Sequence, residues 1–421
     1  MNTETEIYDA IRPKKVITKK LLIILSVIFF LIALLLIMIK IKYPTASPFS
    51  SAYYIAVNIF SPHKKMDKQV VGFLPYWRMD DIKYIRFDLL SELIFFSLTI
   101  DENGDIVKVV GNETDPGWRW WASKTVKNLV AKTQISGGKI SLTAAMLKNS
   151  TLESFLDNQK AQTNLIAQLL ELVKTNHLDG INLDFEYDGE LPDESYREKF
   201  TNFAALFSQN FEDSSPETEL SIDLYATSVT KPRLLDVAKL APLFDKVIVM
   251  SYDYYASSSK VSGPIAPMGG YAEGKYYYDV TTTYNDYLQV VPKDKIIMGI
   301  PYYTYDYPVE VGDVPMSAVL PQDDTNGYTS ILSYGRMRED ANLKNAFCSW
   351  DNLAQENFCY YQDPLTGKFH QVWIEDNKSI KIKFDYAKNK GLGGIAIWAL
   401  GYDKPYNDLW NMIYQIFEKK Y

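Results

Sequence analysis

The chain has 421 residues, enough for one large domain with an appendage, and 47% hydrophobic with 23% charged residues is an ordinary globular composition. Its net charge of −8 and pI of about 5.2 argue against a nucleic-acid partner, which would call for a basic face or stripe. The three His and two Cys show no zinc-ligand spacing, so neither a metal site nor a resident cofactor is expected.

An apolar segment near the N-terminus is predicted to cross a membrane. Residues 21–39 form a run of nineteen residues in which Ser26 alone is polar. At ~1.5 Å per residue, such a helix spans the ~30 Å hydrocarbon core of a bilayer. We assign residues 21–41 to a signal anchor. The alternative is a cleaved signal peptide, but the run exceeds the usual ~7–15 apolar residues of such a segment.

The charges around this segment predict its orientation. Five basic residues precede it and two follow closely: Arg12, Lys14, Lys15, Lys19 and Lys20 before, Lys40 and Lys42 after. The positive-inside bias therefore makes residues 1–20 a cytoplasmic tail and places the rest of the chain outside the cell membrane. We expect a single-pass membrane protein whose main domain faces the exterior.

The remainder of the chain divides into a linker and one large domain. Residues 42–67 contain Pro and Ser without a clear period and are predicted to be a linker. From residue 68 to 421, short apolar runs alternate with helical patterns, which is typical of repeated βα units. Eight strands are predicted, at 70–77, 93–100, 139–146, 180–187, 219–226, 246–253, 295–303 and 393–400. Eight such strands indicate an α/β fold, the (β/α)8 TIM barrel.

The spacing of the last two strands predicts an insertion. About ninety residues separate Tyr303 from Gly393, too many for one loop and one helix. We therefore expect an inserted subdomain at about 306–378, between strands seven and eight. Cys348 and Cys359 both fall in this segment. One local disulfide and two unpaired thiols are both compatible with the sequence.

The fourth predicted strand carries the most informative pattern. In LDGINLDFEY, period-2 alternation puts Ile181, Leu183 and Phe185 on one face. Asn182, Asp184 and Glu186 then point into the barrel, where apolar side chains are usual and a buried carboxylate is costly. Two acids at the C-terminal rim fit glycoside hydrolysis, in which one group protonates the leaving oxygen and another stabilises positive charge.

These residues resemble family 18 glycoside hydrolases, whose signature on this strand is DGxDxDxE. Here the motif runs from Asp179 to Glu186 and departs from the pattern at Asn182. The form GxNxDFE resembles the branch that includes spore-cortex and peptidoglycan-acting glucosaminidases and chitobiase. Further segments match in order: VGFLPYW, VMSYDYY with GPIAP, MGIPYYTYD, and QVWIED with GLGGIAIWALGYD. The third strand reads SLTAAM where chitinases usually have SxGG, so a chitinase subgroup is not assigned.

The resemblance implies roles for individual residues. Glu186 would be the acid and then the base, while the nucleophile is the N-acetyl oxygen of the substrate itself. Asp184 would orient the acetamido group, and Tyr252 would hydrogen-bond its carbonyl. The substrate-binding positions would be Asn182, Asp253, Met250, Trp398, Tyr76 and Tyr303, with Trp398 as the apolar floor of the −1 subsite.

Asn182 predicts a change in the electrostatics of the strand. An aspartate at this position would place a like charge near Asp184 and raise a pKa. A neutral amide removes that repulsion and still donates a hydrogen bond. We therefore expect Asp184 to ionise more readily, and activity to be retained.

The predicted function is cleavage of β-1,4-linked N-acetylglucosamine polymers, namely chitin or chitooligosaccharides, by a retaining mechanism. Two alternatives remain open. One is a peptidoglycan N-acetylglucosaminidase, and the other is a catalytically silent carbohydrate-binding surface protein on the same barrel. The presence of Glu186 favours an enzyme over the silent protein.

Overall fold

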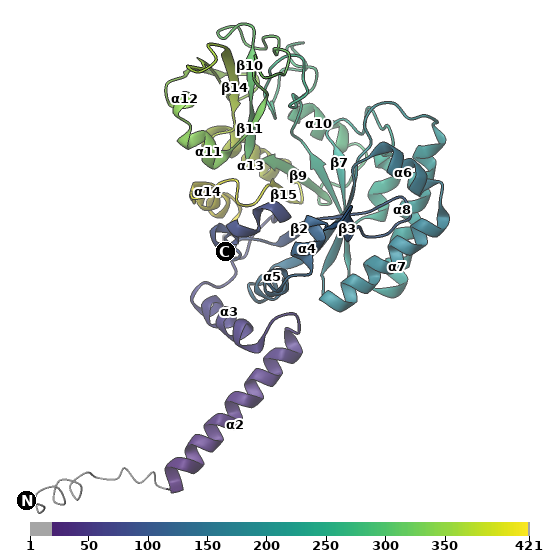
Figure 1. Cartoon of the computed structure of the whole chain (residues 1–421), viewed down its shortest axis with the longest axis vertical. Coiled ribbons are helices and arrows are strands. Elements are labelled where there is room, and N and C mark those ends of the chain that lie inside the picture. The colour runs from purple at the N-terminus through teal and green to yellow at the C-terminus, as the bar shows by residue number, and fades with distance from the viewer. Residues whose placement is uncertain (1–18, 420–421) are drawn as a thin grey trace, which may run out of the picture.

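The computed structural model describes residues 19–419, which form three parts (Figure 1). Two N-terminal helices lead to a barrel, and a separate antiparallel sheet is inserted near the end of the barrel sequence. The expected cytoplasmic tail, residues 1–20, lies almost entirely outside the described residues.

Eight parallel strands close into the barrel predicted from the sequence. Around the barrel their order is β1, β2, β5, β6, β7, β8, β9 and β15. Their bounds are Gln69–Pro75, Glu92–Thr99, Lys139–Met146, Gly180–Phe185, Glu219–Tyr225, Lys246–Met250, Ile296–Pro301 and Gly394–Trp398. Each predicted strand overlaps an observed one, so the (β/α)8 fold is confirmed.

Helices cover the outside of the barrel. The longer ones are α5 (Lys124–Ile135), α6 (Asn149–Leu156), α7 (Gln159–Asn176), α8 (Ser195–Ser214), α10 (Val280–Tyr287), α13 (Asn377–Lys390) and α14 (Asp408–Phe417). Short elements complete the connections: the 3-10 helices η1 (Tyr76–Tyr84) and η2 (Ala241–Leu243), the helices α4 (Pro116–Trp121) and α9 (Val237–Leu240), and the strands β3 (Val109–Val110) and β4 (Glu113–Thr114).

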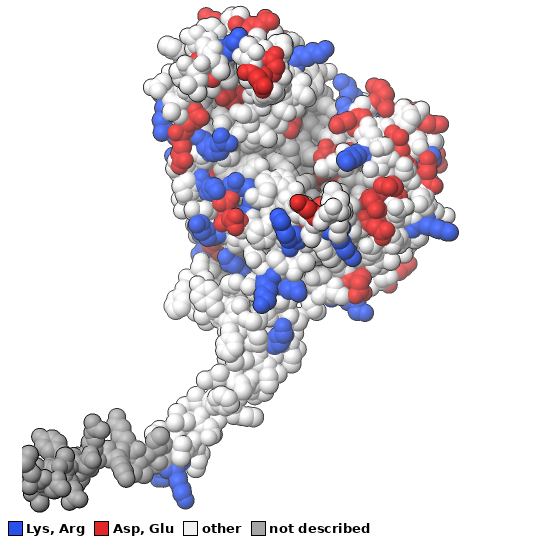
Figure 2. All heavy atoms as spheres, in the orientation of Figure 1, with Lys and Arg blue, Asp and Glu red and all other residues white. Residues whose placement is uncertain are grey.

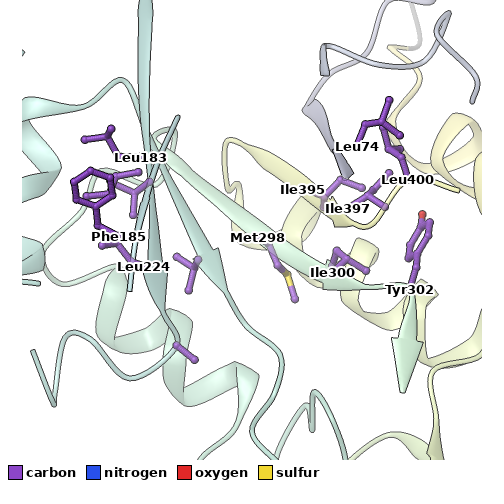
Figure 3. Close-up of a cluster of buried hydrophobic side chains, with 14 of the residues drawn as sticks. Leu74, Leu183, Phe185, Leu224, Met298, Ile300, Tyr302, Ile395, Ile397 and Leu400 are labelled. Carbon is purple, nitrogen blue, oxygen red and sulfur yellow. The ribbon is translucent and has the colours of Figure 1, made fainter. Parts of the chain in front are cut away.

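The two faces of the strands have different surroundings. Outward side chains such as Leu183, Phe185 and Leu224 are buried in the main apolar core (Figure 3). The inward side chains of β1, β2, β8, β9 and β15 form a second apolar cluster that includes Phe73 and Ile248. Those of β5, β6 and β7 are largely polar: Ser141, Thr143, Asn182, Asp184, Ser221 and Asp223. The barrel interior is therefore apolar on one side and polar on the other.

An ion cluster closes the N-terminal end of the barrel. Lys246 is buried, and its Nζ pairs with Glu219 at 2.6 Å and with the buried Glu92. Ser141 donates a hydrogen bond to Glu92, and the half-exposed Lys139 pairs with Glu219. We call Glu92, Lys246, Glu219 and Ser141 the basal cluster. Each buried carboxylate in it has a cationic partner, which offsets the cost of removing charge from water.

The insertion is a five-stranded antiparallel sheet in the order β11, β10, β14, β13 and β12. The strands are β10 (Tyr303–Val309), β11 (Ser330–Ser333), β12 (Phe347–Asp351), β13 (Glu356–Gln362) and β14 (Phe369–Ile374), with the helices α11 (Tyr334–Glu339) and α12 (Ala341–Lys344). It therefore begins at Tyr303, directly after the barrel strand β9, slightly earlier than 306. Cys348 and Cys359 face each other across β12 and β13 and form a disulfide.

The N-terminal part consists of two helices. Helix α2 (Lys19–Lys42) contains the expected span, and it is the one helix among residues 19–419 that is long and apolar enough to cross a membrane. A signal sequence near the N-terminus can also be long and apolar enough to meet this description. Residues 42–67 were expected to be a linker, but they contain helix α3 (Pro48–Phe60). Ser47 caps this helix by accepting from the Ser50 N–H at 3.1 Å, and Pro48 suits its first turn.

Candidate active site

A cavity of about 580 Å³ opens at the C-terminal ends of the barrel strands, a size typical of small-molecule sites. Figure 2 shows the surface hollowed between the inserted sheet and the barrel. Five acidic residues line the cavity: Asp184, Glu186, Asp188, Asp223 and Asp253. Arg233 is the only Lys or Arg among the lining residues in the described chain. The cavity is therefore strongly acidic.

Strand β6 delivers the two acids that the alternation predicted. Asp184 is buried, whereas Glu186 follows the last residue of the strand and is partly exposed to the cavity. The Tyr225 hydroxyl donates a hydrogen bond of 2.9 Å to Glu186 Oε2. Burial raises the pKa of Glu186, and this hydrogen bond opposes the rise. A raised pKa suits a group that must carry a proton to the substrate.

Asp184 lies deeper in the barrel than Glu186, and its carboxylate charge is poorly compensated by its neighbours. Its Oδ1 has no hydrogen-bond partner among residues 19–419. Burial raises its pKa well above the ordinary value of 3.8, and the charges of Glu186 and Asp223 raise it further. Although residue 182 is a neutral Asn, Asp184 does not ionise readily, first because it is buried and then because Glu186 and Asp223 supply like charges.

Asn182, a predicted substrate-binding residue, lies away from the cavity. It is fully buried below the cavity and does not line it. Its side-chain amide donates to Asp223 Oδ1 at 2.9 Å and to Ser221 Oγ at 3.1 Å, while its oxygen accepts from Thr143 at 2.8 Å. Asn182 therefore supports Asp223 from below rather than meeting a ligand.

Tyr252 and Asp253 follow strand β8 and reach the cavity as expected. Gly299 on β9 makes room for the Tyr252 ring, since a Cβ there would lie 2.9 Å from Tyr252 Cε1. Asp253 accepts hydrogen bonds from the hydroxyls of Tyr303 at 2.5 Å and Tyr305 at 3.2 Å. Burial raises the pKa of Asp253 despite these bonds. Tyr303, the first residue of β10, also lines the cavity, so the insertion completes its wall.

Aromatic rings form the apolar side of the cavity. Trp398 lies 4.7 Å from the Phe96 ring and 5.8 Å from the Phe73 ring, centroid to centroid, and all three line the cavity with Met250. Tyr76 does not line it. Its ring packs against the main apolar core, and the exposed Trp77 beside it faces the cavity instead. The chain turns into η1 after β1, so strand alternation no longer predicts which side chain points inward.

The lining residues that sequence analysis missed include Asp223, Tyr225 and Arg233. In ELSIDLY, the alternation that identified β6 would also have placed Ser221, Asp223 and Tyr225 on the inner face of β7. Arg233 lies in the loop after β7, where no periodicity applies. Its guanidinium carbon is 5.7 Å from the centre of the Tyr225 ring.

The acidic side chains of the cavity are not arranged as a metal site in the part of the chain that the structure describes. Among residues 19–419, no group of three or more His, Cys, Asp or Glu side chains is arranged to hold a metal ion. The functional groups that line the cavity include carboxyl groups, tyrosine hydroxyls, one guanidinium and an aromatic floor.

Comparisons with known proteins agree with this geometry. A family model described as glycosyl hydrolases family 18 matches residues 69–403. Rat (Rattus norvegicus) di-N-acetylchitobiase is 26% identical over 309 residues, which cover 69% of this chain and 79% of that protein. A cortical fragment-lytic enzyme of Bacillus subtilis is 28% identical over 272 residues, covering 62% of this chain and 57% of that enzyme. The crystal structure of an Ostrinia furnacalis group IV chitinase with allosamidin superposes with a TM-score of 0.70 at 19% identity, covering 83% of this chain and 98% of that one.

Proposed function

Because the chain belongs to glycosyl hydrolases family 18, we propose that its cavity cleaves β-1,4-linked N-acetylglucosamine polymers with retention of configuration. The observation that carries this proposal is a pair of acids from β6. Glu186 faces the cavity and has a raised pKa, and below it lies the buried Asp184, whose Oδ1 has no hydrogen-bond partner among the described residues. The similarity to proteins named chitobiase and chitinase supports the sugar class.

In the proposed first step, Glu186 donates its proton to the glycosidic oxygen as the bond between this oxygen and the anomeric carbon breaks. The carbonyl oxygen of the substrate's 2-acetamido group forms the new bond to that carbon, which gives a cyclic oxazolinium ion. Asp184 Oδ1 accepts the acetamido N–H, and the positive charge that develops there stabilises the ionised carboxylate. Tyr252 donates to the acetamido oxygen and Trp398 packs under the sugar ring.

In the second step, Glu186 accepts a proton from a water molecule as the water oxygen attacks the anomeric carbon. The oxazolinium ring opens, the acetamido group is restored, and Glu186 is protonated again. Asp253, held by Tyr303 and Tyr305, is placed to bind sugar hydroxyls at the wall formed by the insertion.

Substrate preference tests this mechanism. Chitohexaose should be hydrolysed and cellohexaose should not, because cellohexaose lacks the acetamido nucleophile. A thiazoline analogue of the cyclic ion should inhibit competitively, since mimics of unstable species bind tighter than substrates. Hydrolysis of cellohexaose at a comparable rate would refute the proposal.

A second candidate substrate is peptidoglycan, and Arg233 favours it. This exposed cation on the rim of an otherwise acidic cavity is suited to the carboxylate of a muramic acid lactyl group. Arg233→Gln should lower kcat/KM on peptidoglycan fragments about tenfold or more, since a hydrogen bond to a charged group contributes ~1.5–3 kcal/mol. Lys231→Gln is the control, because Lys231 is exposed but does not line the cavity. Equal losses on chitooligosaccharides would assign Arg233 to neutral sugar binding.

We further propose that α2 is an uncleaved anchor, with its N-terminus in the cytoplasm and the barrel outside. The basic residues before the span and its length of 24 residues support this orientation. Protease added to intact cells should digest the barrel, and carbonate washing should leave the full chain in the membrane pellet. A new N-terminus between residues 40 and 60 in the culture medium would show cleavage instead.

A further inference from the structure

Helix α3 has two different faces. The face formed by Ser51, Tyr54, Ile55 and Asn58 is wholly or partly buried against the barrel domain. Tyr54 and Ile55 pack on an apolar cluster with Ala131 and Ile135 of α5, and the Asn58 amide donates to the Ile135 carbonyl at 2.8 Å. Helix α3 is thus fixed to the barrel.

The opposite face of α3 is apolar and uncovered. The side chains of Phe49, Tyr53 and Phe60 are 74%, 65% and 90% exposed, and Ala56 and Val57 between them are exposed as well. At ~100° per residue these five positions fall within one third of the helix circumference. The helix carries no charged residue. A patch of this kind on a protein surface marks a site of interaction.

The position of α3 relative to α2 identifies what covers this face. Leu35 and Ile39 of α2 line a groove with Ile55 and Ile59 of α3, so the two helices pack together near the end of α2. Lys40 holds the turn between them by donating to the carbonyls of Pro44 at 2.6 Å and Ala46 at 3.0 Å. Leu35 lies seven residues before the end of α2, or ~10 Å at 1.5 Å per residue. This matches the ~5–10 Å depth at which amphipathic helices lie in a membrane interface.

We propose that α3 is an interfacial helix whose exposed face, Phe49, Tyr53, Ala56, Val57 and Phe60, is buried in the lipid of the outer leaflet. This inference rests on the proposed anchor role of α2. In Figure 2 the surface of both helices between the barrel and the far end of α2 is largely white, without the mixed charges of the barrel surface. The barrel domain then lies directly on the bilayer surface and is not connected to it by a flexible linker.

The position of α3 on the barrel also determines which way the cavity opens relative to the membrane. Helix α3 contacts the C-terminal end of α5, just before β5 begins at Lys139, which is the N-terminal end of the barrel. The cavity lies at the opposite, C-terminal end of the strands. Figure 1 shows α2 and α3 on the side of the barrel away from the inserted sheet. The cavity therefore opens away from the membrane, toward polymers outside it.

Lipid quenching tests this proposal on the full chain in liposomes. An environment-sensitive fluorophore on Ala56→Cys should be quenched by nitroxide-labelled lipids at least about threefold more than the same label on Thr325→Cys. Thr325 is an exposed control in the loop between β10 and β11. Adding Phe49→Ser, Tyr53→Ser and Phe60→Ser should abolish the difference while the chain still resists carbonate extraction, and circular dichroism should show that the fold is kept.

Equal quenching at the two sites in carbonate-resistant protein would overturn the interfacial role of α3 and leave the α2 anchor intact. Crosslinking of Ala56→Cys between two chains, without quenching, would assign the face to a second copy and likewise refute the proposal. Loss of carbonate resistance in the unsubstituted chain would refute the α2 anchor and, with it, the interfacial role of α3 that rests on it.

Discussion

The two ends of the barrel differ in how the charges of their buried side chains are compensated. At the N-terminal end, Lys246 offsets Glu92 and Glu219 inside the basal cluster. At the C-terminal end, Asp184, Asp223 and Glu186 lie close together with raised pKa values, and no Lys or Arg pairs with them in the described chain. In the first arrangement, opposite charges offset the cost of their burial. The second is costly to the fold and makes proton transfer and charge stabilisation available to a substrate.

The largest expected effect is on turnover at the C-terminal end. Glu186→Gln should lower kcat by roughly 10²–10⁴ because it removes the general acid. Steady-state hydrolysis of chitohexaose measures the loss, and Glu190→Gln on the exposed loop after β6 is the control. A variant within threefold of the unsubstituted enzyme would remove Glu186 from the mechanism.

The basal cluster should respond in stability instead. Lys246→Met leaves the buried Glu92 without its cation, and breaking a buried pair costs about 3–5 kcal/mol of unfolding free energy. Lys139→Met should cost less than about 1 kcal/mol, because the Lys139 side chain is half exposed. Denaturant unfolding measures both. A similar cost for the two variants would mean that burial does not distinguish the pairs.

Asp184→Asn should separate activity from stability. Turnover should fall by about 10²–10³, as expected when a group that stabilises a developing charge is lost. The unfolding free energy at pH 7 should rise in this variant. An acid whose pKa is raised by folding destabilises the folded state at pH values above its unfolded pKa, where the acid ionises in the unfolded chain. The gain should vanish below pH 3.8, where the unfolded acid is also protonated. A loss of stability at pH 7 would show that Asp184 is compensated after all.

The smallest effects are expected in the pH profile of kcat/KM. The Tyr225 hydrogen bond stabilises ionised Glu186, so Tyr225→Phe should raise the pKa of Glu186 and move the alkaline limb of the profile to higher pH. The charge of Asp188 raises the pKa of Glu186, so Asp188→Asn should move that limb to lower pH. Shifts in the same direction for both variants would disprove the electrostatic account.

Much of the architecture could be predicted because it depends on local patterns. Every barrel strand was visible as a short apolar run, and the alternation in β6 placed Asp184 and Glu186 on the inner face. Asp223 and Tyr225 obey the same alternation in β7, but only the pairing of β6 with β7 shows that they meet Asp184 and Glu186. A contact between strands is not encoded in the period of either one.

The sequence by itself determined the apolar span of α2, the eight strands and the carboxyl pair on β6, because hydrophobic periodicity and length are properties of the local chain. Only the tertiary structure decided that Asn182 lies below the cavity, that Trp77 rather than Tyr76 faces it, and that α3 binds α5 with one side while exposing the other. These outcomes depend on which distant surfaces meet. The pKa of Asp184 is such an outcome too, since burial and the charge of Asp223 arise only once β6 and β7 lie side by side.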